Sequence, residues 1–333
     1  MKICFYARLK EDWYFDLLDF YSNDIKIFKE LGHEVVKVHN WKMLPRDCDL
    51  YFIWWWSSGI IPIIKANRLS KPVITIGNIH YYDMSDQGYF QRPFYIKQFI
   101  KYSLKHSDVQ IATAKIELEG IKKLGAVNPI LIYHAIDSNK YSFKPNENRE
   151  DFLLTLTQLT KPNIQRKKVK EIILAFANVS PLFPKLKLYI VGNKKDDGYA
   201  DLLELVKNQK LDNKVEFLDK VSDTEKIDLY QRCRIYIQPT SFEGFGMAIA
   251  ESMLCGAPVI TSRNGAVPEV CGDSAVYVNP DDIKDISKGI EKLMSDDIFR
   301  NNLSISGYER IRDLFSYEVR KENIRLLLDK YIN

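Results

Sequence analysis

Two glutamates and two glycines give one segment of the chain the means to bind and activate an anionic ligand. The segment spans residues 239–261 and places Glu243 and Glu251 around Gly244 and Gly246. Glycines let a backbone approach a ligand closely, and the free N–H groups at the start of the helix expected here attract negative charge. At a rise of about 1.5 Å per residue, the two carboxylates are too far apart along the helix to share one proton. Each can therefore contact a different part of a bound molecule.

A basic cluster precedes that segment in the chain. Arg166 and Lys167 come just before a helical pattern over 169–179. Two cations here can hold an anionic group, because fixed positive charge stabilises negative charge without a metal. The alternatives are that the cluster is a solvated helix start, and that the glutamates are ordinary charges at a helix start and on a helix surface.

Short apolar runs alternate with helical patterns on both sides of a polar stretch at 143–151. The expected strands are 2–7, 34–38, 50–56, 73–76, 109–112, 130–133, 152–156, 186–191, 215–218, 235–238, 259–261 and 275–278. The expected helices of the second half are 169–179, 199–210, 224–232, 246–254, 283–294 and one from 298 to the end. This alternation predicts an α/β protein with parallel sheets covered on both faces.

The polar stretch divides the pattern in two. We expect two doubly wound, Rossmann-like domains at 1–148 and 149–315 whose parallel sheets face a cleft. A C-terminal helix at 316–333 is expected to pack back toward the first domain. In such sheets ligands bind beyond the carboxyl ends of the strands, which is where the segment at 239–261 begins.

That segment resembles the donor site of retaining family 4 glycosyltransferases, which have the GT-B fold. Their signature has two glutamates separated by seven residues, in the pattern E-G-F-G…E-A-M-A-C-G-x-P-V. From Glu243 this chain reads Glu-Gly-Phe-Gly…Glu-Ser-Met-Leu-Cys-Gly-Ala-Pro-Val. Further on, residues 264–270 are similar to the family's G-G-x-P-E-V loop and 278–282 to its V-x-P-x-D segment. The resemblance covers 152–295.

The resemblance implies a role for each residue of this region. Glu243 contacts the donor sugar as a catalytic group, Glu251 binds the ribose, and Arg166 and Lys167 hold the diphosphate. The family lysine matches Lys167; the family arginine usually stands five residues earlier, and Arg166 takes its role. The other donor-binding residues implied are Gly244, Phe245, Gly246, Met247, Asn193 and Val221.

The first half matches the family less well. Candidate contacts to the donor or acceptor are His80 and Arg8, which follow expected strands, and Trp56, which ends one. His80 stands near the place of a family histidine that contacts the donor sugar, but a structural histidine is the more common explanation. Arg8 could meet a phosphate or an acidic acceptor. Tryptophans stack on sugar rings, although core packing explains at least one of the three at 54–56.

Aromatic and basic residues interleave from position 90 to 105. They are Phe90, Phe94, Tyr95, Phe99 and Tyr102 with Arg92, Lys97, Lys101 and Lys105. On a helix they form an aromatic stripe beside basic residues, which is typical of a membrane surface. A helix packed on its sheet has the same periodicity, and we favour that explanation. Peripheral membrane contact therefore stays open as a partner.

Composition narrows the class of protein. The 333 residues carry a formal charge of +4, too small an excess to indicate nucleic-acid binding. Five scattered cysteines without C-x-x-C favour reduced thiols in a cytosolic protein. The N-terminus lacks the apolar region of a secretory signal, and the most apolar stretch, 50–64, is too interrupted to span a bilayer. We expect a cytoplasmic protein, at most bound to the inner membrane face.

We therefore expect an enzyme that moves a sugar from a nucleotide-diphosphate sugar, first of all a UDP-sugar, to a saccharide, glycolipid or other acceptor. The resemblance implies retention of anomeric configuration and a place in cell-surface polysaccharide or glycolipid synthesis. The nucleotide-sugar is a co-substrate, and no cofactor is expected. No metal is expected either, because Asp47 and Asp49, which spell D-x-D, precede a strand and lie at its amino end.

Two other functions are compatible with parts of the sequence. A non-catalytic protein that binds a sugar nucleotide or glycan on the same scaffold is the alternative. An NAD-dependent oxidoreductase is less favoured, because Gly244 and Gly246 are followed by Ile249 where the dinucleotide motif G-x-G-x-x-G needs a third glycine.

Overall fold

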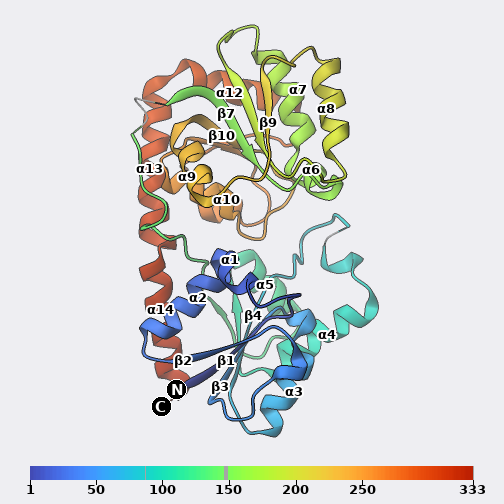
Figure 1. Cartoon of the computed structure of the whole chain (residues 1–333), viewed down its shortest axis with the longest axis vertical. Helices are drawn as coiled ribbons and strands as arrows, with labels where there is room; N and C mark the ends of the chain where they lie inside the picture. Colours follow the sequence, from blue (N-terminus) through green and yellow to red (C-terminus); the bar gives the residue numbers. More distant parts are fainter. Residues whose placement is uncertain (87, 146–148, 333) are drawn as a thin grey trace. The chain divides into compact units, whose positions relative to one another are not determined.

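The chain folds into two compact units. The computed structural model describes residues 1–86, 88–145 and 149–332, with side chains described to residue 329. Unit 1 joins Met1–Ala135 to Tyr317–Asn333, and unit 2 is Ile136–Ser316. Each unit is one parallel sheet with helices on its faces (Figure 1).

Unit 1 contains a six-stranded parallel sheet in the order β2-β1-β3-β4-β5-β6. Its strands are β1 (Lys2–Tyr6), β2 (Glu34–Val38), β3 (Leu50–Trp54), β4 (Val73–Ile76), β5 (Val109–Ala112) and β6 (Pro129–Leu131). Its helices are α1 (Tyr14–Leu17), α2 (Asp19–Glu30), α3 (Ile60–Arg68), α4 (Phe94–His106), α5 (Lys115–Lys123) and α14 (Tyr317–Ile332).

The strands of unit 1 bury both faces, as a parallel sheet covered by helices requires. Along β1, Ile3 and Phe5 enter one core cluster, whereas Cys4 and Tyr6 enter the other. Successive side chains of a strand point to opposite faces, so an unbroken apolar run supplies both cores. This is why unit 1 reads in the sequence as short apolar runs without polar alternation.

Unit 2 contains a second parallel sheet, in the order β12-β11-β10-β7-β8-β9. Its strands are β7 (Glu150–Leu156), β8 (Lys187–Val191), β9 (Val215–Leu218), β10 (Cys233–Gln238), β11 (Val259–Thr261) and β12 (Val276–Tyr277). Its helices are α6 (Lys161–Lys167), α7 (Val169–Val179), α8 (Tyr199–Asn208), α9 (Asp223–Arg232), α10 (Met247–Leu254), α11 (Val267–Cys271), α12 (Ile283–Ser295) and α13 (Asp297–Phe315).

The two doubly wound parallel sheets expected from the alternation are confirmed. Counted from its own first strand, unit 2 has the order of the dinucleotide-binding fold, and the order reverses between β7 and β10. In unit 1 the order reverses between β1 and β3. Such a reversal sends neighbouring loops to opposite faces of the sheet and leaves a crevice beyond the carboxyl ends of the strands.

The boundary between the units differs from the one expected at 148. Residues from Ile136 onward belong to unit 2, where the Ile136 N–H donates to the Phe315 carbonyl at 2.8 Å. The Lys140 ammonium pairs with the Asp223 carboxylate at 2.7 Å in the same unit. The polar composition of 143–151 is typical of a linker, but local composition does not report such long-range contacts.

The C-terminal segment was expected as one helix from residue 298, and this is wrong. Ser316 has extended backbone angles and separates α13 from α14. α14 belongs to unit 1, where Arg320 donates two hydrogen bonds to Asp24 of α2, at 2.6 and 2.9 Å. Both side chains are buried, so each charge is balanced by the other.

Candidate functional site

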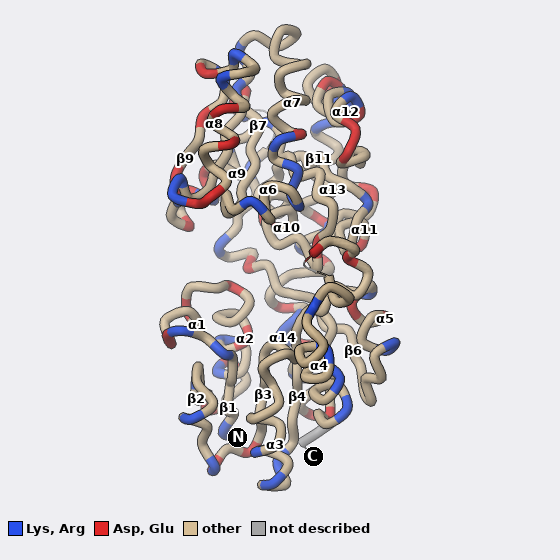
Figure 2. Tube along the Cα trace, turned by 90° about the vertical axis from the view of Figure 1, so that its right-hand side faces the viewer, with Lys and Arg blue, Asp and Glu red and all other residues tan. Residues whose placement is uncertain are grey.

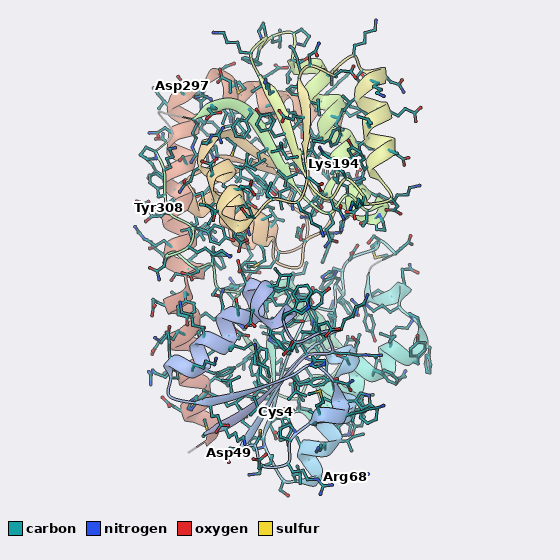
Figure 3. All side chains as sticks on the ribbon, in the orientation of Figure 1. Cys4, Asp49, Arg68, Lys194, Asp297 and Tyr308 are labelled. Atoms are coloured by element: carbon teal, nitrogen blue, oxygen red, sulfur yellow. The ribbon has the colours of Figure 1, made fainter. Side chains whose placement is uncertain are left out.

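The candidate site lies at the carboxyl edge of the sheet in unit 2, where the strand order reverses. α6 follows β7, and the loop of residues 239–246 follows β10. Lys194, in the loop after the neighbouring β8, marks the same edge in Figure 3. Side chains carried by the loops after β7 and β10 therefore meet in the crevice of this unit.

Two cations and one carboxylate meet there. The Arg166 guanidinium lies 2.8 Å from Glu243 Oε1, and the Lys167 ammonium lies 3.8 Å from the same oxygen. All three side chains are at most 16% exposed. Burial lowers the pKa of Lys167, an effect that the nearby Glu243 carboxylate opposes and Arg166 reinforces. One carboxylate does not neutralise two cations, so the cluster favours a further anion.

Gln238, the last residue of β10, organises this cluster and was missed in the sequence. Its amide nitrogen donates to Glu243 Oε1 at 2.9 Å. Its amide oxygen accepts from Lys167 at 3.3 Å and from the Tyr236 hydroxyl at 2.8 Å. Burial and the two site glutamates raise the pKa of Tyr236, so its hydroxyl keeps its proton. A polar residue directly after the apolar run 235–237 was the signal available.

Backbone contacts hold the cluster in register. The Arg166 carbonyl accepts from the Ser241 N–H at 2.7 Å and from the Thr240 hydroxyl at 3.1 Å. The Glu243 carbonyl accepts from the Ala266 N–H at 2.8 Å. Gly265 has a φ of +65°, and a Cβ there would lie 2.2 Å from the Glu243 carbonyl oxygen. Glycine at 265 therefore lets the loop after β11 support Glu243.

The basic pair precedes α7, as expected, but it also ends a helix of its own. Arg166 and Lys167 occupy the last turn of α6, which the sequence analysis did not predict. Lys168 then adopts a left-handed conformation at φ +58°, and α7 begins at Val169, as expected. α6 is short and has one buried residue, so its sequence shows no helical period of apolar residues from which it could be predicted.

The start of α10 supplies backbone donors near the cluster. Gly246 has a φ of +95° and no side chain caps the helix, so N–H groups of the first turn remain for a ligand or solvent. Gly244 is buried and Met247 is partly buried. The Phe245 ring is 3% exposed and lies edge-on to the Phe315 ring at 5.6 Å, so this side chain packs in the core of unit 2.

Glu251 is not a surface charge of α10. It is 6% exposed, and its carboxylate lies 3.3 Å from the Lys226 ammonium and accepts from the Tyr230 hydroxyl at 3.3 Å. Both partners belong to α9 and were missed in the sequence. The explanation of Glu251 as an ordinary solvated charge is therefore wrong.

The remaining residues expected in unit 2 lie at the same sheet edge but serve their own loops. The Asn193 amide donates to Asp196 at 3.1 Å and its oxygen accepts from the Lys195 N–H at 3.1 Å. Val221 is half-buried between β9 and α9. No interaction in the described chain links Asn193 or Val221 to Glu243 or Lys167.

The residues expected in the first half belong to unit 1. Trp56 is 2% exposed and its indole N–H donates to Thr75 at 3.1 Å. His80 has a φ of +53° and shares with Trp56 a cavity of about 190 Å³, which Arg92 also lines. Arg8 is exposed beyond the end of β1.

A buried carboxylate under the His80 loop was not foreseen. Glu117 is 1% exposed and accepts from the N–H groups of Ile79 and His80, at 2.8 and 3.1 Å. Burial raises its pKa to about 7, although these two hydrogen bonds oppose the rise. Glu117 thus holds the loop that carries His80. Asp47 and Asp49 lie at the opposite edge, where both accept from Lys2.

Comparison with known proteins places this site in a family. The family model described as "Glycosyl transferases group 1" matches residues 137–310, more than half of the 333 residues. The chain belongs to the glycosyl transferases group 1 family. The matched residues include the whole cluster around Glu243 and Glu251.

Curated relatives share this region. The O-antigen chain mannosyltransferase B of Escherichia coli is 29% identical over 154 residues, which are 46% of this chain and 40% of the relative. The capsular polysaccharide biosynthesis glycosyltransferase CapM of Staphylococcus aureus is 26% identical over 240 residues, 70% of this chain and 61% of the relative. The chain thus matches less than two thirds of the length of either relative.

Solved structures extend the likeness to both units. Sucrose-phosphate synthase from Thermosynechococcus elongatus has a TM-score of 0.79 at 17% identity, with 99% of each chain covered. HepE from Anabaena, solved with UDP and glucose, has a TM-score of 0.77 at 17% identity, covering 99% of this chain and 100% of HepE. At this identity the likeness shows the fold alone, and the fold is GT-B, as the sequence analysis expected.

Proposed function

We propose that this family member transfers a sugar from a nucleotide-diphosphate sugar to an acceptor hydroxyl. The observation that carries the proposal is the meeting of Arg166, Lys167 and Glu243 at the strand-order reversal of unit 2, next to the start of α10. A buried cluster with excess positive charge and free helix N–H groups suits a diphosphate.

The diphosphate is the group that these cations stabilise. As the bond from the anomeric carbon to the diphosphate oxygen breaks, its electron pair stays on the diphosphate, whose charge grows. Lys167 and Arg166 are fixed by Gln238 and Glu243 before a donor binds, so they need no rearrangement as that charge develops. The acceptor oxygen then bonds to the anomeric carbon and passes its proton to the departing diphosphate oxygen, which has gained the electron pair of the broken bond.

The two carboxylates act at the two ends of the donor. Glu243 lies against the sugar, where its negative charge favours the positive charge that develops at the anomeric carbon. Glu251 accepts hydrogen bonds from the ribose hydroxyls, and Lys226 and Tyr230 hold it in place. We propose transfer with retention of the anomeric configuration, on the family resemblance of the Glu243–Glu251 segment.

A UDP-sugar is the first donor to test, because HepE was solved with UDP and glucose. Mannosyl donors belong in the same test, because curated relatives are named mannosyltransferases. A saccharide or lipid-linked acceptor in polysaccharide or glycolipid synthesis is proposed, since CapM is named for capsular polysaccharide biosynthesis.

Nucleotide binding tests the donor site directly. A thermal-shift panel of UDP, GDP, dTDP and ADP and their sugars is expected to give stabilisation restricted to one base, because only a bound ligand raises the folded state's stability. Calorimetry with that nucleotide then compares Glu251→Ala and Glu251→Gln with the exposed Glu204→Ala of α8. Loss of a charged hydrogen-bond acceptor should weaken binding about tenfold or more.

The outcomes separate the possible functions. Unchanged nucleotide affinity in both Glu251 variants would refute the ribose assignment. Nucleotide-sugar binding without turnover, even with a range of acceptors, would favour the non-catalytic alternative. The anomeric configuration of the product, read by proton NMR, decides between retention and inversion.

A further inference from the structure

The helix α4 of unit 1 has an exposed face that its packing on the sheet does not explain. Ile100, Ser103 and Leu104 are buried against the rest of the unit. Phe94 and Tyr95, in contrast, are 74% and 57% exposed. The explanation favoured from the sequence, that this aromatic stripe packs on the sheet, is therefore wrong for these rings.

Four exposed rings lie on α4 or just before it, and we call them the α4 patch: Phe90, Phe94, Tyr95 and Phe99. Tyr95 and Phe99 are in ring contact at 5.8 Å, and both Phe90 and Phe99 are exposed. Lys97 donates to the Phe90 carbonyl at 3.3 Å and so ties Phe90 to the first turns of α4. Exposed aromatic patches of this kind mark interaction surfaces.

The patch is flanked by positive charge. Lys97, Lys101 and Lys105 follow one another at four-residue spacing, and α4 contains no acidic residue. Within the described chain, neither Lys101 nor Lys105 forms an ion pair. Figure 2 shows the basic positions along this helix. The row of lysines and the rings thus border the same part of the helix surface.

Unit 2 offers no counterpart. Its exposed large hydrophobic residues in the described chain are Leu182, Ile298, Ile305 and Leu314, all aliphatic. They are scattered singly, which is normal for a protein surface. The aromatic patch is therefore a property of unit 1 and not of the fold that both units share.

We propose that the α4 patch docks unit 1 on the headgroup region of an anionic lipid bilayer. Aromatic rings prefer the boundary between headgroups and hydrocarbon, and lysines beside them are attracted to anionic lipids. The contact is peripheral, since none of the described helices is both long and apolar enough to cross a bilayer.

The patch also borders the cavity that Trp56 and His80 line. Arg92, two residues before α4 begins, lines that cavity, and Ile100 of α4 lines it as well. Docking through α4 therefore brings this cavity close to lipid headgroups. The bilayer contact stands by itself, but its use in presenting a lipid-linked acceptor rests on the proposed function.

Vesicle binding tests the contact without any assay of sugar transfer. The full chain should co-sediment with vesicles of phosphatidylcholine and phosphatidylglycerol in equal parts, and much less with phosphatidylcholine alone. Phe94→Ser, Tyr95→Ser and Phe99→Ser combined should abolish this binding. Lys101→Glu with Lys105→Glu should weaken it by at least about fivefold per lysine, and added salt should weaken the wild type.

Matched variants of unit 2 control for a general loss of exposed apolar groups or of positive charge. Leu182→Ser with Ile298→Ser removes equally exposed apolar groups of unit 2, and Lys284→Glu with Lys288→Glu reverses two exposed charges on α12. Both controls should bind vesicles like the wild type. All substituted positions are exposed or at the surface, and a melting curve of each variant verifies folding.

Three results would overturn the proposal. The first is wild-type chain that stays in solution with both vesicle types. The second is equal losses in the α4 variants and the unit 2 controls. The third is a dimer in sedimentation equilibrium that the α4 variants abolish without changing vesicle binding, which assigns the patch to a second copy of the chain. Failure of nucleotide binding would leave the vesicle result standing, so the two proposals fail separately.

Discussion

The carboxyl edges of the two sheets differ in chemistry although their backbones are built alike. In unit 2 that edge gathers Arg166, Lys167 and Glu243 into one hydrogen-bonded cluster. In unit 1 it forms a cavity with aromatic walls, where Trp56, His80 and Arg92 meet. The same doubly wound architecture therefore supports an ion-paired site in one unit and an aromatic one in the other, because side chains of the loops set the chemistry.

The two edges also bury a carboxylate by different means. Glu243 is met by the charged side chains of Arg166 and Lys167. Glu117 of unit 1 is met by two backbone N–H groups, and burial raises its pKa to about 7. Paired charges can act on a charged ligand, whereas the carboxylate of Glu117 holds the loop that carries His80 in place.

The largest effect is expected at the cluster of unit 2. Lys167→Ala should lower kcat for sugar transfer by about 10²–10³, the loss typical when one fixed charge-stabilising donor is removed from a site. Steady-state kinetics measures this, with the exposed Lys170→Ala as the control. Similar kcat values for the two variants would show that Lys167 does not stabilise the leaving group, and the proposed difference in chemistry between the two sheet edges would be lost.

The next largest effect is expected for Glu117 and the dependence of the stability of unit 1 on pH. The raised pKa means that folded unit 1 binds a proton more tightly than the unfolded chain, whose glutamates titrate near about 4.3. The stability from this group is therefore full below that pH and is lost as pH rises through about 7. The free energy of unfolding should fall by up to about 3 kcal/mol over this window.

Fluorescence isolates this prediction, because all five tryptophans of the chain, at positions 13, 41 and 54–56, belong to unit 1. Urea unfolding followed by tryptophan emission should show the fall in the wild type and a flatter profile in Glu117→Gln. A free energy of unfolding that rises between pH 5 and pH 7, equally in the wild type and in Glu117→Gln, contradicts the assignment to Glu117.

A smaller effect compares two glycines with positive φ, one in each unit. Gly265→Ala should cost about 2–3 kcal/mol, since the new Cβ meets the Glu243 carbonyl and the backbone is left-handed. Gly32 has a φ of +82°, but a Cβ added there would meet no other atom, so Gly32→Ala should lower the free energy of unfolding by about 1 kcal/mol. Calorimetric melting measures both, and only Gly265→Ala should also lower turnover. Equal costs would mean that the loop after β11 does not support Glu243.

The smallest effect is expected at Asn193. Its side chain serves its own turn through Asp196 and the Lys195 N–H. Asn193→Ala should therefore change the KM for the donor by less than about fivefold, the equivalent of about 1 kcal/mol for one hydrogen bond. A drop in kcat comparable with that of Lys167→Ala would place Asn193 in the site itself.

Most of the fold could be predicted because its signals are local. Each strand of both sheets overlaps an expected apolar run, although β6, β7 and β10 begin one or two residues before it, and α7 spans Val169–Val179 as expected. An apolar run or a helical period can be recognised from neighbouring residues in the sequence. The same holds for the residue types around Glu243, whose order along the chain was sufficient to indicate the family.

The sequence by itself thus determined two parallel-sheet units and which segment of unit 2 carries acids, cations and glycines. Only the tertiary structure decided that α6 ends with Arg166 and Lys167 in its last turn, and that Gln238 forms hydrogen bonds with both Lys167 and Glu243. It also decided that the aromatic rings of the α4 patch are exposed. The physical reason is distance along the chain: these features depend on contacts between residues tens of positions apart, and no local pattern of hydrophobicity or charge encodes which partners will meet.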